Sequence, residues 1–165
     1  TMDISMNLYN CILNANVMSG RKISLEASGS SADFGSVTAK DGFSLTGVSV
    51  QVNADKVASM YSVITANSSD LSLNSISGSL TTDTTLCTEN YNYEKLSGNI
   101  TAKSVLGELN ITVPKQSNAA LRHVESYAKY ECTINSPDEN DKNVNSRYTV
   151  DTNVKFGIVT LAEKE

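Results

Sequence analysis

The stretch KLSGNITAKS, residues 95–104, contains the pattern on which the fold prediction rests. In it, Gly98 is followed by Asn, a β-branched residue, Thr and Ala. The same order, with Ser after the glycine, occurs in Gly35-Ser36-Val37-Thr38-Ala39, and Gly78-Ser79-Leu80-Thr81-Thr82 repeats it with Leu in place of the β-branched residue and Thr in place of Ala. Weaker copies lie at residues 20–25, 60–66 and 107–113. The chain is therefore built on an internal repeat.

The spacing of the repeat indicates a solenoid. Gly98 follows Gly78 by 20 positions, and Gly78 follows Gly35 by 43, about two such steps. This step lies at the short end of the range for solenoid repeats, about 20–50 residues. We expect each glycine to turn the chain with a positive φ. The aliphatic residue two positions later would face inward and the next Thr outward, and each coil would stack on its neighbours.

Apolar and polar residues alternate through most of the chain, which places the apolar set of each segment on one face of a strand. One alternative to the solenoid is a sandwich whose glycines form hairpin turns. Helical spacing is scarce, and its best candidate is residues 118–130, where strands starting near Tyr127, Tyr130 and Cys132 are the alternative. The alternating sets are Ile4/Met6/Leu8, Ile23/Leu25/Ala27, Val37/Ala39, Phe43/Leu45, Val48/Val50/Val52, Leu71/Leu73, Ile100/Ala102 and Leu109/Ile111/Val113.

The sequence thus predicts an all-β, single-domain β-solenoid over residues 1–165, with roughly 20 residues per coil. Residues 118–146 are predicted to form an irregular or partly helical excursion, which includes the polar loop SPDENDKNVNS at 136–146. Two capping strands, 147–154 and 155–161, should follow, and the second would be the terminal coil. Glu163, Lys164 and Glu165 would blunt its exposed edge.

The run LSGNITAKSVLGELNITVPKQSNAAL, residues 96–121, resembles the C-terminal signature of the bacterial adhesin-type β-solenoid domain family, which also has eukaryotic relatives. The signature is two glycine-led strands in close succession, then Val113-Pro114 and a stretch of small residues. Residues 70–84 are similar to the coil pattern of the family, and residues 156–161 to its closing strand. Most members have no assigned function, and the resemblance implies a solenoid without catalytic residues and a lean towards surface interaction.

Composition and charge exclude several kinds of partner. The formal net charge is −5, and the longest basic run is Arg21-Lys22. Nucleic-acid binding and polybasic attachment to membranes both need clustered Lys and Arg. No apolar stretch approaches the roughly 20 residues of a membrane-spanning helix, and no signal peptide pattern is visible after Thr1. We therefore expect protein partners, no nucleic acid and no membrane insertion.

The three cysteines, Cys11, Cys87 and Cys132, form no Cys-x-x-Cys pair, which excludes the usual zinc-ribbon and thioredoxin motifs. The odd count favours three buried thiols in a reducing compartment, and one disulfide with one free thiol is the alternative.

Residues with catalytic or metal-binding chemistry are scattered. His123 is the single histidine, and no Gly-x-Ser-x-Gly or phosphate-binding Gly-x-x-x-x-Gly-Lys motif accompanies it. Residues 138–141, Asp-Glu-Asn-Asp, are oxygen-rich, but Lys142 and Asn143 break the EF-hand calcium pattern. We therefore predict no catalytic residue, no cofactor and no metal site.

Three N-glycosylation sequons begin at Asn67, Asn99 and Asn110. The latter two fall in predicted strands, whereas an acceptor site needs a surface loop of a secreted protein. We interpret the sequon at Asn99 as a by-product of the repeat, which places Ser or Asn after glycine.

These observations predict a non-enzymatic structural or protein-interaction module, adhesin-like in character. Exposed Ser, Thr and Asn, with tyrosines such as Tyr91 and Tyr93, would supply contacts. One alternative is an accessory scaffold subunit of a large multiprotein assembly, with a mitochondrial assembly among the candidates. A carbohydrate-active solenoid enzyme is less favoured, because paired carboxylates and aromatic platforms are sparse. The first function implies a cell-surface or secreted location and the second an organellar one.

Overall fold

The computed structural model describes residues 2–115, 117, 119–134 and 147–164. In these residues the structure is all-β, and every strand pairing is parallel. Parallel pairing between successive coils excludes the sandwich with hairpin turns. The strands are β1 (Ile4–Tyr9), β2 (Ile12–Ser28), β3 (Ser31–Val48), β4 (Gln51–Ala54), β5 (Val57–Asn67), β6 (Asp70–Thr85), β7 (Thr88–Tyr93), β8 (Ile100–Val105), β9 (Glu108–Pro114), β10 (Ala119–Ser126), β11 (Lys129–Cys132), β12 (Tyr148–Lys155) and β13 (Ile158–Lys164).

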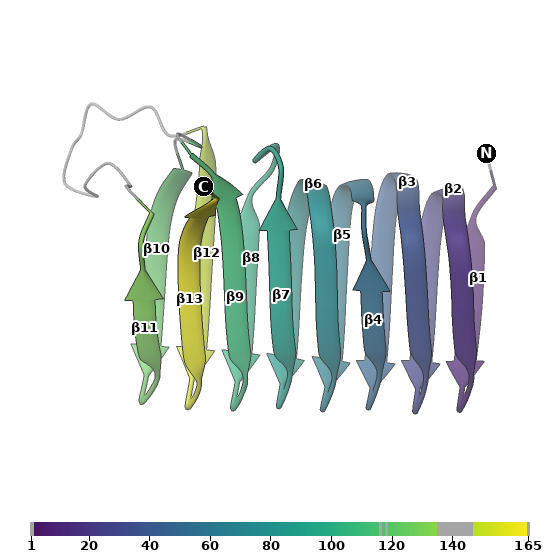
Figure 1. Cartoon of the computed structure of the whole chain (residues 1–165), viewed down its shortest axis with the longest axis horizontal. Coiled ribbons are helices and arrows are strands. Elements are labelled where there is room, and N and C mark those ends of the chain that lie inside the picture. The colour runs from purple at the N-terminus through teal and green to yellow at the C-terminus, as the bar shows by residue number, and fades with distance from the viewer. Residues whose placement is uncertain (1, 116, 118, 135–146, 165) are drawn as a thin grey trace.

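The strands form a two-sided β-solenoid (Figure 1). Each coil runs up one face, turns over at a wide edge, runs down the other face and reverses at a tight edge. From β1 to β9, register partners lie about one predicted repeat apart, as in Ile23 to Phe43 and Leu80 to Ile100. The predicted solenoid and its coil length are confirmed.

The core lies between the two faces, and the repeat predicts which residues enter it. Val37, Leu80 and Ile100 are fully buried, whereas the threonines that follow them are exposed. Burying one such aliphatic side chain is worth about 1.5–3 kcal/mol. Because neighbouring coils supply most of this burial, the coils stabilise one another rather than folding singly.

The glycines of the repeat act differently from the prediction. Among these glycines only Gly78 has a positive φ, at 95°. Gly98 has none, so its predicted left-handed turn is wrong. Gly98 is needed because a Cβ there would lie 2.4 Å from the carbonyl carbon of Gly78 and from the Ser79 nitrogen. The repeat thus marks where the backbones of two coils approach too closely for a side chain.

The tight edge consists of a row of left-handed residues, one per coil. All but Tyr127, which lies in the end coil, donate their N–H to the next coil, as Leu86 does to the Val105 oxygen and Leu106 to the Lys155 oxygen. One of these residues, Ser49, interrupts the predicted alternation, so Val48 points outward, 52% exposed, while Val50 is buried. In spatial order the row is Asn10, Gly29, Ser49, Ser68, Leu86, Leu106, Phe156 and Tyr127, with φ between 48° and 59°.

The predicted helix at residues 118–130 is wrong, because β10 and β11 occupy this segment. Its side chains continue the two faces of the solenoid, as Leu121 pairs with Val150 and Tyr130 with Val159. The alternative, strands near Tyr130 and Cys132, is closer to the structure. The polar loop at 136–146 lies outside the described residues.

The last coil of the chain is not the last coil in space. β12 pairs with β8 on one side and β10 on the other, and β13 pairs with β9 and β11. The terminal position predicted for 155–161 is therefore wrong. β11 pairs with β13 only as far as Leu161, so the edge-blunting role of Glu163 and Lys164 stays a prediction, and Glu165 lies outside the described residues. The coil β10–β11 forms that end of the solenoid, as Figure 1 shows.

Candidate interaction surfaces

One face of the solenoid carries a row of amide and carboxylate side chains, which we call the asparagine face. Strand register aligns the row along the stack in the order Asn14, Asp33, Asn53, Ser72, Asn90 and Asn110. The amide of Asn53 donates to Asp33 at 2.7 Å, and the amide of Asn110 donates to Asn90 at 3.1 Å. These bonds stabilise the stack, and the remaining donors and acceptors face solvent.

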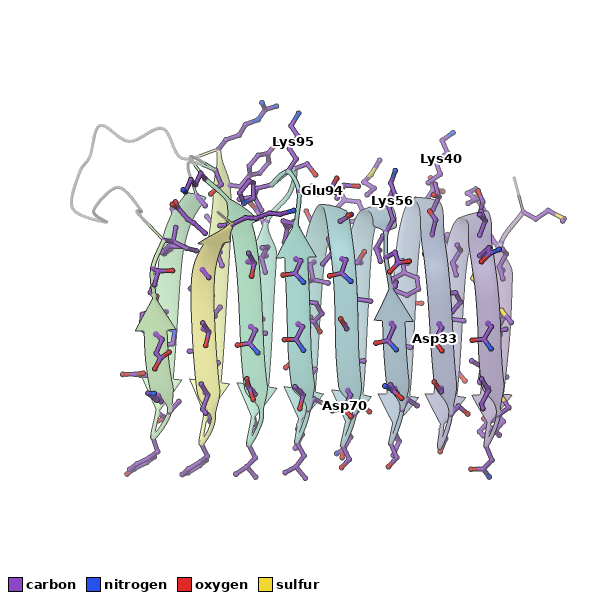
Figure 2. The ribbon with its side chains drawn as sticks, viewed as in Figure 1. Asp33, Lys40, Lys56, Asp70, Glu94 and Lys95 are labelled. Atoms are coloured by element: carbon purple, nitrogen blue, oxygen red, sulfur yellow. The ribbon has the colours of Figure 1, made fainter. Side chains whose placement is uncertain are left out.

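A shallow hollow of about 430 Å³ lies on this face, lined by Asn14, Asn16, Asp33, Asn53 and Asp55 among others. Figure 2 labels Asp33 on this face. Asp33 is aligned with asparagines on both sides rather than with a second carboxylate. The geometry therefore offers a polar contact surface, and it brings no matched carboxylate pair together in register.

A second surface is the half of the tight edge that is nearer to the end coil β10–β11. There Leu86, Leu106, Phe156 and Tyr127 follow one another along the stack. We call these four residues the apolar ridge. They are 54%, 51%, 53% and 87% exposed. The rings of Tyr127 and Phe156 stack with centroids 5.3 Å apart and planes 4° apart. The ridge is thus a continuous exposed apolar row made of residues far apart in the sequence.

The wide edge carries lysines. Lys40, Lys56 and Lys95 project from it, beside Glu94 (Figure 2). They come from separate coils, so the search for basic runs in the sequence could not reveal them. The nearby Arg21 is bound to Asp3, with Nη2 2.8 Å from Oδ2, and this pair lowers the pKa of Asp3.

A buried polar cluster lies inside the solenoid around Glu89. Its two register neighbours are aliphatic, Leu71 on one side and Leu109 on the other. Glu89 is fully buried, and its carboxylate accepts hydrogen bonds from the Thr84 hydroxyl and, at 2.9 Å, from the Tyr91 hydroxyl. Burial raises the pKa of Glu89, although these hydrogen bonds oppose the rise.

Tyr91 and Tyr93, which the sequence predicted to be contact residues, are buried at 0% and 1% exposure, so that prediction is wrong. Burial raises the pKa of both phenols. The Tyr91 hydroxyl binds Glu89, whereas the Tyr93 hydroxyl has no hydrogen-bond partner in the described part of the chain. Their positions follow from the period of two, which turns residues 89, 91 and 93 inward together.

His123 lies in β10, the strand of the end coil that pairs with β12. Its Nδ1 lies 2.9 Å from the Thr152 hydroxyl, and its Nε2 lies 3.3 Å from Glu125. Its ring stacks on Tyr130 with centroids 3.8 Å apart. These contacts close the end of the core with polar and aromatic side chains.

The three cysteines are free thiols, but the prediction that all three are buried is wrong for Cys11 and Cys132. Cys87 is buried, and desolvation raises the pKa of its thiol. Cys11 is half-buried and Cys132 is exposed. A raised pKa keeps Cys87 protonated and unreactive.

The three sequons lie in different settings. Asn67 ends β5 beside the left-handed Ser68, and its side chain accepts a hydrogen bond from that serine. Asn99 is exposed just before β8 and accepts the Thr149 N–H at 3.1 Å. Asn110 lies within β9, as predicted, and bonds to Asn90. The acidic residues 138–141 fall outside the described residues.

Among the described residues, no three His, Cys, Asp or Glu side chains gather closely enough to hold a metal ion. The same residues include no helix with the length and hydropathy needed to span a membrane.

Comparison with known proteins identifies one family. The family model described as Toastrack DUF4097 matches residues 2–156, nearly the whole chain. No curated protein and no solved structure matches the sequence.

Proposed function

The chain belongs to the Toastrack family, and from this premise we propose that it is a non-enzymatic structural module that binds other proteins in the manner of an adhesin. The observation that carries the proposal is the asparagine face, a row of four asparagines and one aspartate, interrupted by Ser72, that strand register aligns along the stack. Neighbouring strands lie about 4.8 Å apart, so the row presents donors and acceptors at a fixed interval. A rigid, repeated polar surface of this kind suits recognition of an extended partner.

The proposal assigns no catalysis to the face. Glycoside hydrolysis uses two carboxyl groups about 5–10 Å apart on either side of the bond that breaks. Here Asp33 has asparagine as its register partner on both sides, and Asp70 has Gln51 and Thr88. Hydrolysis of a polysaccharide by the purified protein, abolished when Asp33 and Asp55 are replaced by Asn, would contradict this part of the proposal.

The test of the binding role is native purification followed by mass spectrometry, with matched variants. In one variant Asn53, Asn90 and Asn110 become Ala. In the control, three polar residues of the opposite face, Ser44, Thr65 and Thr101, become Ala. We expect a stoichiometric protein partner that is lost only from the asparagine-face variant. Loss from both variants, or from neither, would contradict the assignment of this face.

A second candidate is an accessory scaffold subunit of a large, organellar multiprotein assembly. The observation that favours it is the set of three free thiols, since unpaired cysteines are typical of proteins in reducing compartments. The same purification separates the two candidates. A fixed set of several partners favours the scaffold, whereas a monomer at the cell exterior favours the adhesin-like module.

A further inference from the structure

The apolar ridge has no explanation in the folding of the chain. A non-glycine residue in the left-handed region bears a steric cost, and a bulky one is unusual there. The other half of the same row holds Asn10, Gly29, Ser49 and Ser68, residue types that tolerate this conformation or bear little bulk. The ridge instead places two leucines and two aromatics at left-handed positions and exposes half or more of each.

Strain combined with exposure of apolar area points to a binding role for these side chains. One further exposed apolar residue, Ile158 at 41% exposure, lies two positions after Phe156. With it, the ridge gathers five of the large apolar side chains that the described residues expose.

The backbone of the ridge is already paired. Leu86, Leu106 and Phe156 donate their N–H groups to the Val105, Lys155 and Ser126 oxygens of the next coil. Glu108 and Ile158, two positions after Leu106 and Phe156, also donate to neighbouring coils. The edge therefore offers these N–H groups to no added strand, and whatever covers the ridge must bind mainly through its side chains. Paired backbone groups are also what entry into a lipid environment requires.

The shape and charge of the ridge favour a bilayer over a protein. The ridge is one side chain wide and four coils long, about 14 Å at the spacing of neighbouring strands. The area that this ridge could bury against a flat protein surface is far smaller than the roughly 800 Å² per partner that a stable interface buries. Lys155 and Glu108 flank the ridge, and Lys129 forms an ion pair with Glu131, so both signs of charge are present. A second copy of this acidic chain would add repulsion to the small contact area.

We propose that the apolar ridge docks the protein on the surface of a lipid bilayer. Its four side chains enter the boundary between headgroups and acyl chains, where Leu, Phe and Tyr are favoured. The long stem of Lys155 reaches back to the headgroups, whereas the Lys129 ammonium is paired with Glu131. The proposal concerns a surface other than the asparagine face. It also departs from the expectation of no membrane insertion, because that expectation considered only apolar or basic residues that are contiguous in the sequence. The fold assembles the ridge from coils that are distant in the sequence.

The test is flotation with vesicles of phosphatidylcholine. In the ridge variant Leu86, Leu106, Phe156 and Tyr127 are all replaced by Asn. In the control variant Val17, Met60 and Tyr61, exposed apolar residues away from the tight edge's apolar half, are replaced by Asn. We expect the vesicle-bound fraction of the ridge variant to be at least about tenfold lower than that of the wild type. The bound fraction of the control variant should match that of the wild type. Because hydrophobic insertion needs no net charge, the bound fraction should persist in high salt.

Misfolding cannot explain the expected loss, because Asn tolerates left-handed backbone better than Leu or Phe does. The ridge variant should melt at or above the wild-type temperature. Equal flotation of the wild type and the ridge variant, or no flotation of the wild type, would overturn the proposal. Self-association in solution that disappears in the ridge variant, without flotation of the wild type, would assign the ridge to a second copy and overturn it too.

Discussion

Gly98 lies directly against Gly78 of the neighbouring coil, so closely that a Cβ on Gly98 would be 2.4 Å from the Gly78 carbonyl carbon. The first prediction follows from this approach. Gly98→Val should lower the melting temperature strongly, because backbone rather than a flexible side chain obstructs the new atoms. Overpacking of this kind costs about 1–3 kcal/mol or more. Thermal melting followed by circular dichroism measures the effect.

Asn99→Ser is the matched control. Asn99 is exposed and its one observed bond is from the Thr149 N–H at 3.1 Å. Losing a single exposed hydrogen bond should cost about 1 kcal/mol or less. If the serine variant melted lower than the valine variant, the close approach of the two coils at Gly98 would be disproved.

The second prediction concerns the pH dependence of Glu89. Burial raises the pKa of this carboxyl, so the folded state favours its protonated form. The stabilising effect of that protonation is complete below the pKa of the unfolded chain, about 4.3. It is lost as the pH rises through the folded-state pKa. We therefore compare the free energy of unfolding of the wild type with that of Glu89→Gln. The wild-type value minus the variant value should increase as the pH falls from 7 to about 4.

Each unit by which the folded-state pKa is raised corresponds to about 1.4 kcal/mol in this difference. Taking the difference between the two proteins removes the effects of the other carboxylates, which titrate in both. Chemical denaturation at several pH values supplies the measurement. A difference that does not change with pH, or that decreases on acidification, would show that Glu89 is ionised in the folded protein.

The third prediction compares two buried tyrosines. The Tyr93 hydroxyl lacks a partner among the described residues, so Tyr93→Phe should stabilise the fold by about 1 kcal/mol. Tyr91→Phe should destabilise it by about 1–3 kcal/mol, because Glu89 loses a donor inside the core. Urea denaturation of the two variants gives both values. Destabilisation by Tyr93→Phe equal to that by Tyr91→Phe would reveal a hydrogen bond at Tyr93.

The fourth prediction tests the strain of the tight edge. Leu106 has a φ of 56°, which glycine adopts without a steric cost. Leu106→Gly should therefore leave stability unchanged or raise it by up to about 1 kcal/mol, although it removes a large apolar side chain. Melting curves of this variant, compared with those of a variant in which the buried Leu109 becomes Gly, decide the matter. Equal losses in both would mean that Leu106 contributes to the core.

The period of two and the repeated glycines were sufficient to predict a solenoid and to place Val37, Leu80 and Ile100 inside it. Both signals are local, because they reflect one strand and the turn beside it. The same alternation also turned Tyr91 inward, but tyrosine chemistry suggested an exposed contact. Polarity at an inward position, as at Glu89, has no signature in a sequence read alone.

The surfaces were harder to predict because they join residues from different coils. Asn53 and Asn90 become members of one row only through strand register. The ridge has a weak local signal, a bulky residue directly before glycine in Leu106-Gly107 and Phe156-Gly157. We attributed the turn to the glycine, whereas the preceding residue adopts the left-handed conformation.

The non-sequential order of the last coils is the relationship on which the ridge depends. Asp151 has Thr101 as its register partner on one side and Arg122 on the other. If the coils followed chain order, Arg122 would lie beside Thr101 instead, and Phe156 would not lie between Leu106 and Tyr127. Nothing in the local pattern of residues 119–164 specifies this order.

Disulfide crosslinking tests the order directly, in a background whose three native cysteines are replaced by serine. Neighbouring strands lie about 4.8 Å apart, within the Cα separation of about 4.4–6.8 Å that a disulfide allows, and second neighbours lie beyond it. Cysteine pairs at positions 101 and 151, and at 122 and 151, should form disulfides on mild oxidation, and the pair at 101 and 122 should not. Efficient crosslinking of 101 to 122, without crosslinking of 101 to 151, would contradict the account.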